Sequence, residues 1–195
     1  KGHGKGAIQL KRSTDGGLTW SPRLPVPDNW ATSLETPTIH RVIDAAGRIV
    51  TPGLIDLHTH VYWGGTSLGV DPLILARGGC TTLVDTGSAG PGNYAGFLEH
   101  VIRPSPVRII AYLNISFAGI YGFSKRIMVG ESGDLRLMAP VDAVEVTRAN
   151  RDTIAGIKVR VGMHASQNSG TIPLDIARQV ADEVGAYLIA DATDV

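Results

Sequence analysis

The sequence contains a single cysteine, Cys80, which excludes an internal disulfide and a zinc site built from several thiolates. It also lacks an excess of charge, since 18 Lys and Arg residues balance 18 Asp and Glu residues. Nothing in its charge therefore favours nucleic acid or an anionic membrane surface as a partner. No apolar run approaches the roughly 18 residues of a transmembrane helix, and the first residues contain no apolar signal segment. We predict a protein with no nucleic-acid or membrane partner, located in the cytoplasm.

The composition is sufficient for a packed core. Of the 195 residues, 43% are hydrophobic and 18% are charged, which excludes wholesale disorder. The pattern changes along the chain: residues 1–41 are rich in Gly, Pro, Ser and Thr, whereas residues 42–195 alternate apolar runs with helical stretches. We therefore predict two segments, with a boundary between residues 41 and 42.

The first segment, residues 1–41, is predicted to be a short β segment. Ser13–Trp20 reads Ser-Thr-Asp-Gly-Gly-Leu-Thr-Trp, in which the Asp can accept backbone N–H bonds in a hairpin turn and the glycines allow positive φ. This stretch resembles the Asp-box of sialidases and other propeller proteins, where the motif is a structural turn. Since a single blade cannot close a propeller, we favour a small β appendage, with carbohydrate binding as an alternative.

The second segment, residues 42–195, has the pattern of βαβ units around a parallel sheet. We expect strands at 54–60, 81–85, 107–114, 154–161 and 187–191, and helices at 72–77, 94–101, 141–150 and 173–184. The stretch 116–139 has no clear period and is expected to be a loop over the strand ends. Since a complete (β/α)8 barrel needs eight units, these five predict an α/β fold that is a partial (β/α) barrel. Its open edges are completed by a homo-oligomer, unless the fold is rearranged or the sequence is a fragment.

The strongest chemical signal is Thr51–His60, which reads Thr-Pro-Gly-Leu-Ile-Asp-Leu-His-Thr-His. Side chains of a strand alternate between its two faces, so Asp56, His58 and His60 are expected on one face. Two imidazoles two residues apart can bind the same ion of zinc type. A polar strand face turned toward water is the competing interpretation.

With its surroundings, this motif resembles the amidohydrolase superfamily, and within it the amidohydrolase/deacetylase enzymes that are similar to dihydroorotases. The resemblance is carried by Val42–Asp56, Gly79–Gly90, Leu113–Ser116 and Gly156–Arg160. It implies that His58 and His60 are metal ligands, and that Lys158 carries a carbamate made with CO2 and bridges two metal ions. The chemistry suits a lysine near the end of an apolar strand, because burial lowers the pKa of its amine. A lysine that snorkels or forms a salt bridge is the alternative.

The sequence departs from the family's pattern at the fifth strand, where Asp191 occupies the place of an expected histidine. A carboxylate can also bind zinc, so His58, His60 and either Lys158 or Asp191 could supply three ligands and leave one position open for water. The family's later histidine and its catalytic aspartate have no counterpart in these residues. Asp85 or Asp191 is the candidate base in their absence.

These observations predict a hydrolase of amide or ester bonds in small acylated substrates, acting through water activated by a divalent metal, with zinc as the favoured ion. Ser88 and Ser116 lack a Gly-x-Ser-x-Gly context, so a serine-hydrolase mechanism is not favoured. The rival interpretations are a non-catalytic relative that has lost the chemistry and a carbohydrate-binding protein based on the Asp-box segment.

Overall fold

The computed structural model describes residues 13–14, 18–22, 47, 49–123, 126–129 and 131–192. The chain divides into two compact units, Lys1–Val50 and Thr51–Val195. Most of the first unit lies outside the described residues, including Asp15 and the glycines of the Asp-box motif. The β segment at 1–41 and its boundary therefore stay predictions. The second unit carries the candidate site.

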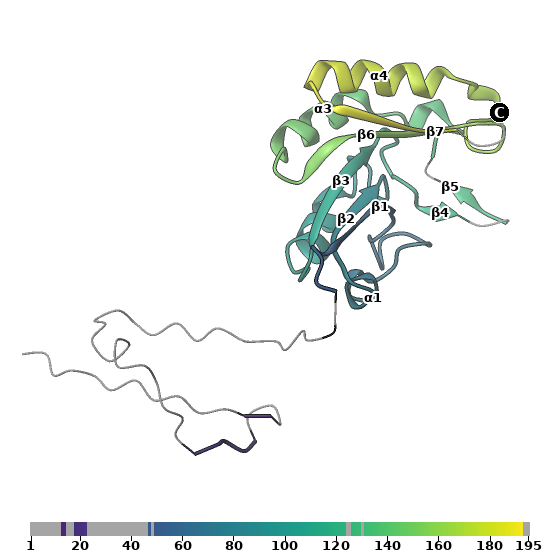
Figure 1. Ribbon diagram of the computed structural model, residues 1–195. Coiled ribbons are helices and arrows are strands. Elements are labelled where there is room, and N and C mark those ends of the chain that lie inside the picture. Colours follow the sequence, from purple (N-terminus) through teal and green to yellow (C-terminus); the bar gives the residue numbers. More distant parts are fainter. Residues whose placement is uncertain are drawn as a thin grey trace, which may run out of the picture. The chain divides into compact units, whose positions relative to one another are not determined.

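Five parallel strands form one sheet in the second unit (Figure 1). They are β1 (Leu54–Thr59), β2 (Cys80–Thr86), β3 (Arg108–Asn114), β6 (Ile154–Val161) and β7 (Tyr187–Ala192). Each strand lies beside the next one along the chain, and each pair is parallel. This is the arrangement of a barrel wall. The predicted fold class, a partial (β/α) barrel of five β/α units, is confirmed.

Helices connect these strands, as the apolar periodicity predicts. They are α1 (Pro72–Arg77), α2 (Tyr94–Phe97) with the π-helical turn η2 (Leu98–Ile102), α3 (Pro140–Ala149) and α4 (Ile172–Val184). Helix α4 runs along β6 and β7 with α3 beside it (Figure 1). It ends at Gly185, whose φ of 62° lets its N–H reach back to the carbonyls of the last turn. None of the helices in the described residues is long and apolar enough to cross a bilayer.

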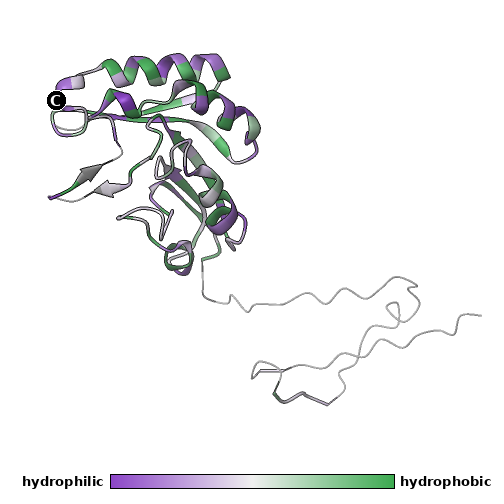
Figure 2. Ribbon diagram, turned by 180° about the vertical axis from the view of Figure 1, so that it is seen from behind, coloured by the Kyte–Doolittle hydropathy of each residue, from purple (hydrophilic) through white to green (hydrophobic). Residues whose placement is uncertain are grey.

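The core lies between the strands and these helices. Leu83, Leu113 and Ile157 are fully buried on three adjacent strands, and Phe97 and Ala177 cover them from the helical side. Figure 2 shows hydrophobic and hydrophilic residues alternating along α4, as expected of a helix with one face on a core. Because the strands are parallel, their carboxyl ends all lie at one edge of the sheet, where barrel enzymes place their active sites.

The long stretch between β3 and α3 forms mostly irregular structure. It contains the two-stranded antiparallel pair β4 (Gly122–Phe123) and β5 (Met128–Val129), followed by the short 3-10 helix η3 (Leu135–Leu137). A second 3-10 turn, η4 (Gln167–Ser169), precedes α4. The stretch between β3 and α3 reaches the carboxyl edge of the sheet and contributes Glu131 to the site.

Candidate metal centre

The two histidines lie at the carboxyl end of β1, which is irregular there. Asp56 is aligned with Leu83 of β2, but Thr59 is aligned with Asp85, so β1 holds one more residue than β2 over this interval. Such a bulge interrupts strand alternation, so the shared face predicted for Asp56 and the two histidines does not follow from alternation alone. The carboxylate of Asp56 instead accepts the backbone N–H of His58 at 3.2 Å.

The two imidazoles are nevertheless neighbours. The ring centroids of His58 and His60 are 5.6 Å apart, with an angle of 69° between the ring planes. A zinc–nitrogen bond of about 2.0–2.1 Å places an imidazole centre about 3 Å from the ion, so two rings on one tetrahedral ion lie about 5 Å apart. The observed distance between the ring centroids is close to this value.

Lys158 lies on β6, aligned with Asn114 of β3 on one side and Ile189 of β7 on the other. Only 1% of its side chain is exposed, and its Nζ lies 3.5 Å from Oδ2 of Asp191. Burial lowers the pKa of the Lys158 amine, and the nearby carboxylates of Asp191 and Glu131 oppose this effect. The amine is therefore easier to deprotonate than that of a surface lysine.

His60 is half-buried and electrostatically coupled to the other site residues. Burial, followed by the charges of Lys158 and His58, lowers the pKa of His60 to about 4, and Asp191 opposes the shift. The ring is therefore neutral at pH 7, which is the form that binds metals. The structure pairs His58 with His60 and Lys158 with Asp191, and the charges of His58, Lys158 and Asp191 all act on His60. The role of these four residues in binding a metal stays a prediction.

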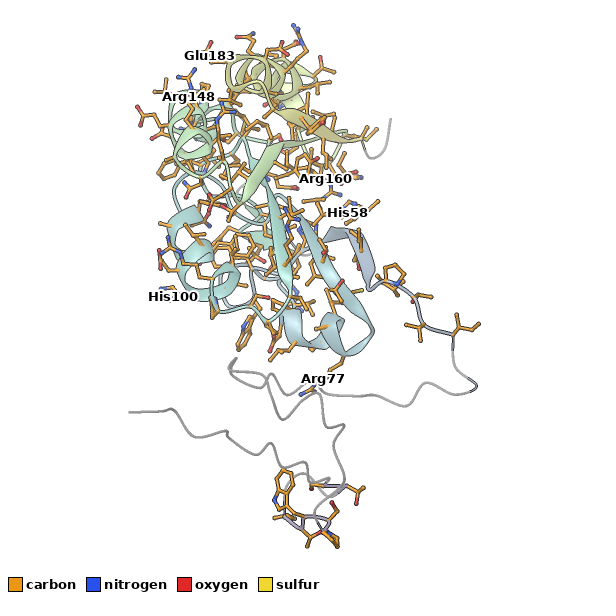
Figure 3. All side chains as sticks on the ribbon, turned by 60° about the vertical axis from the view of Figure 1, so that its left-hand side comes forward. His58, Arg77, His100, Arg148, Arg160 and Glu183 are labelled. Atoms are coloured by element: carbon orange, nitrogen blue, oxygen red, sulfur yellow. The ribbon has the colours of Figure 1, made fainter. Side chains whose placement is uncertain are left out.

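Asp191 and Arg160 extend this group along β6 and β7. The two residues are aligned across the strand pair, and Nε of Arg160 lies 3.8 Å from Oδ2 of Asp191. The Asp191 side chain is 30% exposed, so it can contact both Lys158 and solvent. In Figure 3, the labelled His58 and Arg160 lie at the same end of the strands.

Sequence-based reasoning missed Glu131, which comes from the irregular stretch after β5. Its side chain is almost fully buried, and Oε2 lies 3.3 Å from Nη1 of Arg160. Burial raises the pKa of the Glu131 carboxyl, with Arg160 and Lys158 opposing the shift. Its Oε1 has no hydrogen-bond partner within the described part of the chain. No periodic pattern in the sequence marks this loop residue. The one available signal is that its loop connects two strands of the sheet along the chain, and so is expected to lie over the strand ends.

Asp85, a predicted base, lies at the end of β2 and is fully buried. Its Oδ2 accepts the N–H of Val61 and the hydroxyl of Ser88, and its Oδ1 accepts the N–H of Ser88. Burial raises the pKa of Asp85, while these hydrogen bonds lower it. A carboxylate with both oxygens engaged and no exposed surface is poorly placed to act on a substrate, so these contacts do not favour the predicted role as base.

No group of three or more His, Cys, Asp and Glu side chains in the described residues is arranged to hold a metal ion. His58, His60 and Asp191 therefore do not form a three-ligand site by themselves, and a site at the carboxyl edge depends on Lys158. A lysine becomes a metal ligand only after it loses its proton or becomes a carbamate. The donor set fits a zinc-type ion on that condition, since imidazole nitrogens and carboxylate-type oxygens are its usual ligands.

Comparisons with known proteins identify relatives of this chain. The model of the amidohydrolase family matches residues 41–85, which include His58 and His60. A deacetylase of Agrobacterium fabrum is 34% identical over 181 residues, which are 92% of this chain and 42% of that protein. A deacetylase of Brucella anthropi is 36% identical over 150 residues, which are 76% of this chain and 37% of that protein. The chain thus spans less than half the length of these relatives.

Solved structures share the fold. A dihydroorotase crystal structure superposes with a TM-score of 0.64 and 29% identity, covering 73% of this chain and 44% of that one. An adenine deaminase superposes with a TM-score of 0.65 over 74% of this chain and 38% of that one, but at 23% identity this likeness concerns the fold alone. With the family match and the deacetylase relatives, the resemblance inferred from the sequence is confirmed: the chain belongs to the amidohydrolase superfamily.

Proposed function

We propose that the chain acts as a metal-dependent hydrolase of amide or ester bonds in small acylated substrates. The observation that supports this proposal is the 5.6 Å spacing of the His58 and His60 rings, together with a buried Lys158 on β6 whose charge acts on His60. The similarity to deacetylases supports the cleavage of an acyl group. Acylated amino acids and acylated hydroxy acids are the proposed substrate class.

The proposed ligands of a divalent ion, with zinc as the favoured metal, are His58, His60 and Lys158, which leave one position open for water. Asp191 is the alternative ligand that the sequence offers in place of Lys158. His60 is suited to this role because its lowered pKa keeps the ring neutral. A bound ion of this kind activates water and polarises the carbonyl of the substrate. The protein must then orient that substrate and accept the proton that water loses.

Asp191 is our proposed proton acceptor. Its carboxylate is the partly exposed one of the group, and Lys158 and Arg160 contact it from β6. These two contacts restrict the orientation of the carboxylate at the edge of the site. A general base placed in this way contributes about 10²–10⁴-fold to a rate.

Lys158 is proposed to act as a carbamate. Its free amine would attack CO2, form a nitrogen–carbon bond and release a proton. The product replaces a buried cation with an anionic oxygen donor, and the lowered pKa of Lys158 makes the free amine accessible. CO2 is then a second cofactor, and a carbamate signal in ¹³C NMR spectra of protein equilibrated with ¹³C-bicarbonate would report it.

Metal content and activity test this proposal together. The chain is purified without chelators, its zinc is measured, and it is assayed with N-acetylated amino acids and O-acetylated hydroxy acids. We expect near-stoichiometric zinc and hydrolysis, and loss of both in His58→Ala. The matched control is His100→Ala, since His100 is an exposed histidine on η2 that lies away from His58 (Figure 3). Absence of metal, or equal activity of His58→Ala and the parent, would contradict the proposal.

A non-catalytic relative is the second candidate function. The observation in its favour is the ion pair between Lys158 and Asp191, because this pair neutralises the buried lysine without metal or CO2. A folded chain that binds no zinc and gives no carbamate signal would support this alternative. Carbohydrate binding by the Asp-box segment concerns residues mostly outside the described ones and stays a prediction.

A further inference from the structure

His60 is linked to the end of β2 by a chain of two hydrogen bonds, the first partly buried and the second buried. Its Nδ1 lies 3.0 Å from Oγ of Ser88, and this Oγ lies 2.7 Å from Oδ2 of Asp85. Ser88 and Asp85 are both fully buried. Water therefore does not compete for the bond between Ser88 and Asp85, and the two bonds together restrict the rotation of the His60 ring.

The direction of this chain follows from its donors and acceptors. Asp85 accepts one backbone N–H at each oxygen, from Val61 and from Ser88, both at 2.8 Å. With the oxygens of Asp85 accepting these bonds, the Ser88 hydroxyl donates its single proton to Oδ2 of Asp85 at 2.7 Å. The Ser88 oxygen can then only accept a hydrogen bond from His60, and Nδ1 of His60 must carry the proton.

This assignment decides which nitrogen is free to bind an ion. A neutral imidazole has one N–H and one lone pair on opposite nitrogens. We propose that Ser88 and Asp85 are positioning residues that hold His60 as its Nδ1–H tautomer and direct the lone pair of Nε2 to the ion shared with His58. The tautomer follows from the contacts of the fold, and its consequence for metal binding rests on the proposed function.

The turn after β2 explains how one serine makes both contacts. Gly87 has a φ of 92°, a conformation that favours glycine, and it turns the backbone so that both N–H and Oγ of Ser88 meet Asp85. A Cβ at Gly87 would lie 2.5 Å from Cγ of Lys158. The turn therefore packs directly on Lys158, so one short segment sets the positions of two proposed ligands.

The chain offers a matched pair of variants for the test. Ser88→Ala removes the hydroxyl that bonds His60. Ser116→Ala removes an equally buried hydroxyl just after β3, which has no hydrogen-bond partner among the residues that the structure describes. Ser88→Thr retains the hydroxyl and should restore the contact. Thermal unfolding of each metal-free variant reports whether it is folded.

The first measurement reads the tautomer directly. Long-range ¹⁵N–¹H spectra of the metal-free chain at pH 7.5 distinguish Nδ1–H from Nε2–H imidazoles, and His60→Gln assigns the His60 signals. We expect the Nδ1–H form in the parent, in Ser116→Ala and in Ser88→Thr, and a shift toward Nε2–H in Ser88→Ala. An Nε2–H ring in the parent, or an unchanged tautomer in folded Ser88→Ala, would overturn the inference.

The second measurement is zinc affinity by competition with a chromogenic chelator. Mutation of a residue that hydrogen-bonds a metal-ligating histidine typically lowers metal affinity by about 10–100-fold. We therefore expect a loss of zinc affinity of that size in Ser88→Ala and no loss in Ser116→Ala. Equal affinities in the two variants would overturn the positioning role. Absence of zinc binding by the parent would instead contradict the proposed function, while the tautomer spectra still decide the state of His60.

Discussion

At the residue scale, the solvent exposure of an ion pair determines how much it contributes to stability and to the site. Arg148 and Glu183 approach to 2.6 Å, but their side chains are 51% and 61% exposed, and Figure 3 shows both on the helical side. Such a pair contributes only about 0–1 kcal/mol. The pair of Lys158 and Asp191 is longer, yet Lys158 is buried, so removing its partner leaves an uncompensated charge. The second pair constrains the site, while the first has little effect on either stability or chemistry.

The candidate ligands were predictable because they occur in a short motif and in strands with clear apolar patterns. Residues that support them were not. Ser88 was considered only as a nucleophile, since a hydroxyl that bonds a histidine from another strand leaves no local pattern. Glu131 reaches Arg160 from a loop without periodicity. Contacts between segments distant in sequence depend on packing, and a single sequence does not encode them in any spacing.

His60 makes the stability of the metal-free chain depend on pH. An unfolded histidine binds a proton near pH 6.5, whereas burial and the neighbouring cations lower the pKa of His60 to about 4. Between these values the unfolded state holds more protons, so the free energy of unfolding falls as the pH falls from 6.5 to 4. Each pKa unit corresponds to about 1.4 kcal/mol, and the partial exposure of the ring reduces the total to about 1–3 kcal/mol.

Urea unfolding of the metal-free chain at pH 4.5 and pH 7 measures this loss. The loss should shrink in His60→Gln and persist in His100→Gln, which changes an exposed histidine. A loss of the same size in His60→Gln and in the parent would assign the pH dependence to other groups.

At the element scale, the strands were predicted within about one residue of their observed ends. Apolar runs bounded by Gly, Pro and polar residues define β2, β3 and β6, in which most or many residues are buried. A similar run defines β7, although none of its residues is fully buried. The irregularity of β1 was not predictable, since a bulge is an extra residue relative to a partner strand and only the pairing reveals it. This is why alternation alone does not establish the face that was predicted to be shared by Asp56 and the two histidines.

The turn after β2 gives a prediction at this scale. Gly87→Ala combines a positive φ with a Cβ placed 2.5 Å from Cγ and 2.8 Å from Cβ of Lys158. Gly185→Ala has a positive φ alone, because nothing in the described residues lies within 4 Å of its added Cβ. Backbone strain of this kind costs about 1 kcal/mol, and overpacking adds about 1–3 kcal/mol.

Chemical denaturation should therefore show a larger loss of unfolding free energy in Gly87→Ala than in Gly185→Ala. Zinc affinity should also fall only in Gly87→Ala, because only this change displaces Lys158. Equal losses of unfolding free energy in both variants would mean that overpacking against Lys158 adds nothing to the cost of backbone strain.

At the scale of the whole molecule, the five strands enclose only part of the surface that a complete barrel would bury. Strands β1 and β7 are the outer strands of the sheet. The proposed ligands come from β1, β6 and β7, so they lie toward both outer strands of the sheet and not at its middle. Whatever covers these strands would also border the candidate site, and it would influence access of substrate and water.

We predict that the chain covers β1 by self-association. Leu54, Ile55 and Leu57 expose 59%, 61% and 71% of their surface on this outer strand. Exposed apolar strands at a sheet edge favour pairing with another chain, and a twofold dimer is the commonest closed arrangement. Size-exclusion chromatography with light scattering should show a dimer that Leu57→Lys dissociates. Val141→Lys, at an exposed apolar residue of α3, should leave it intact. A folded parent that stays monomeric at all concentrations would contradict this prediction, because β1 would then be stable without a partner.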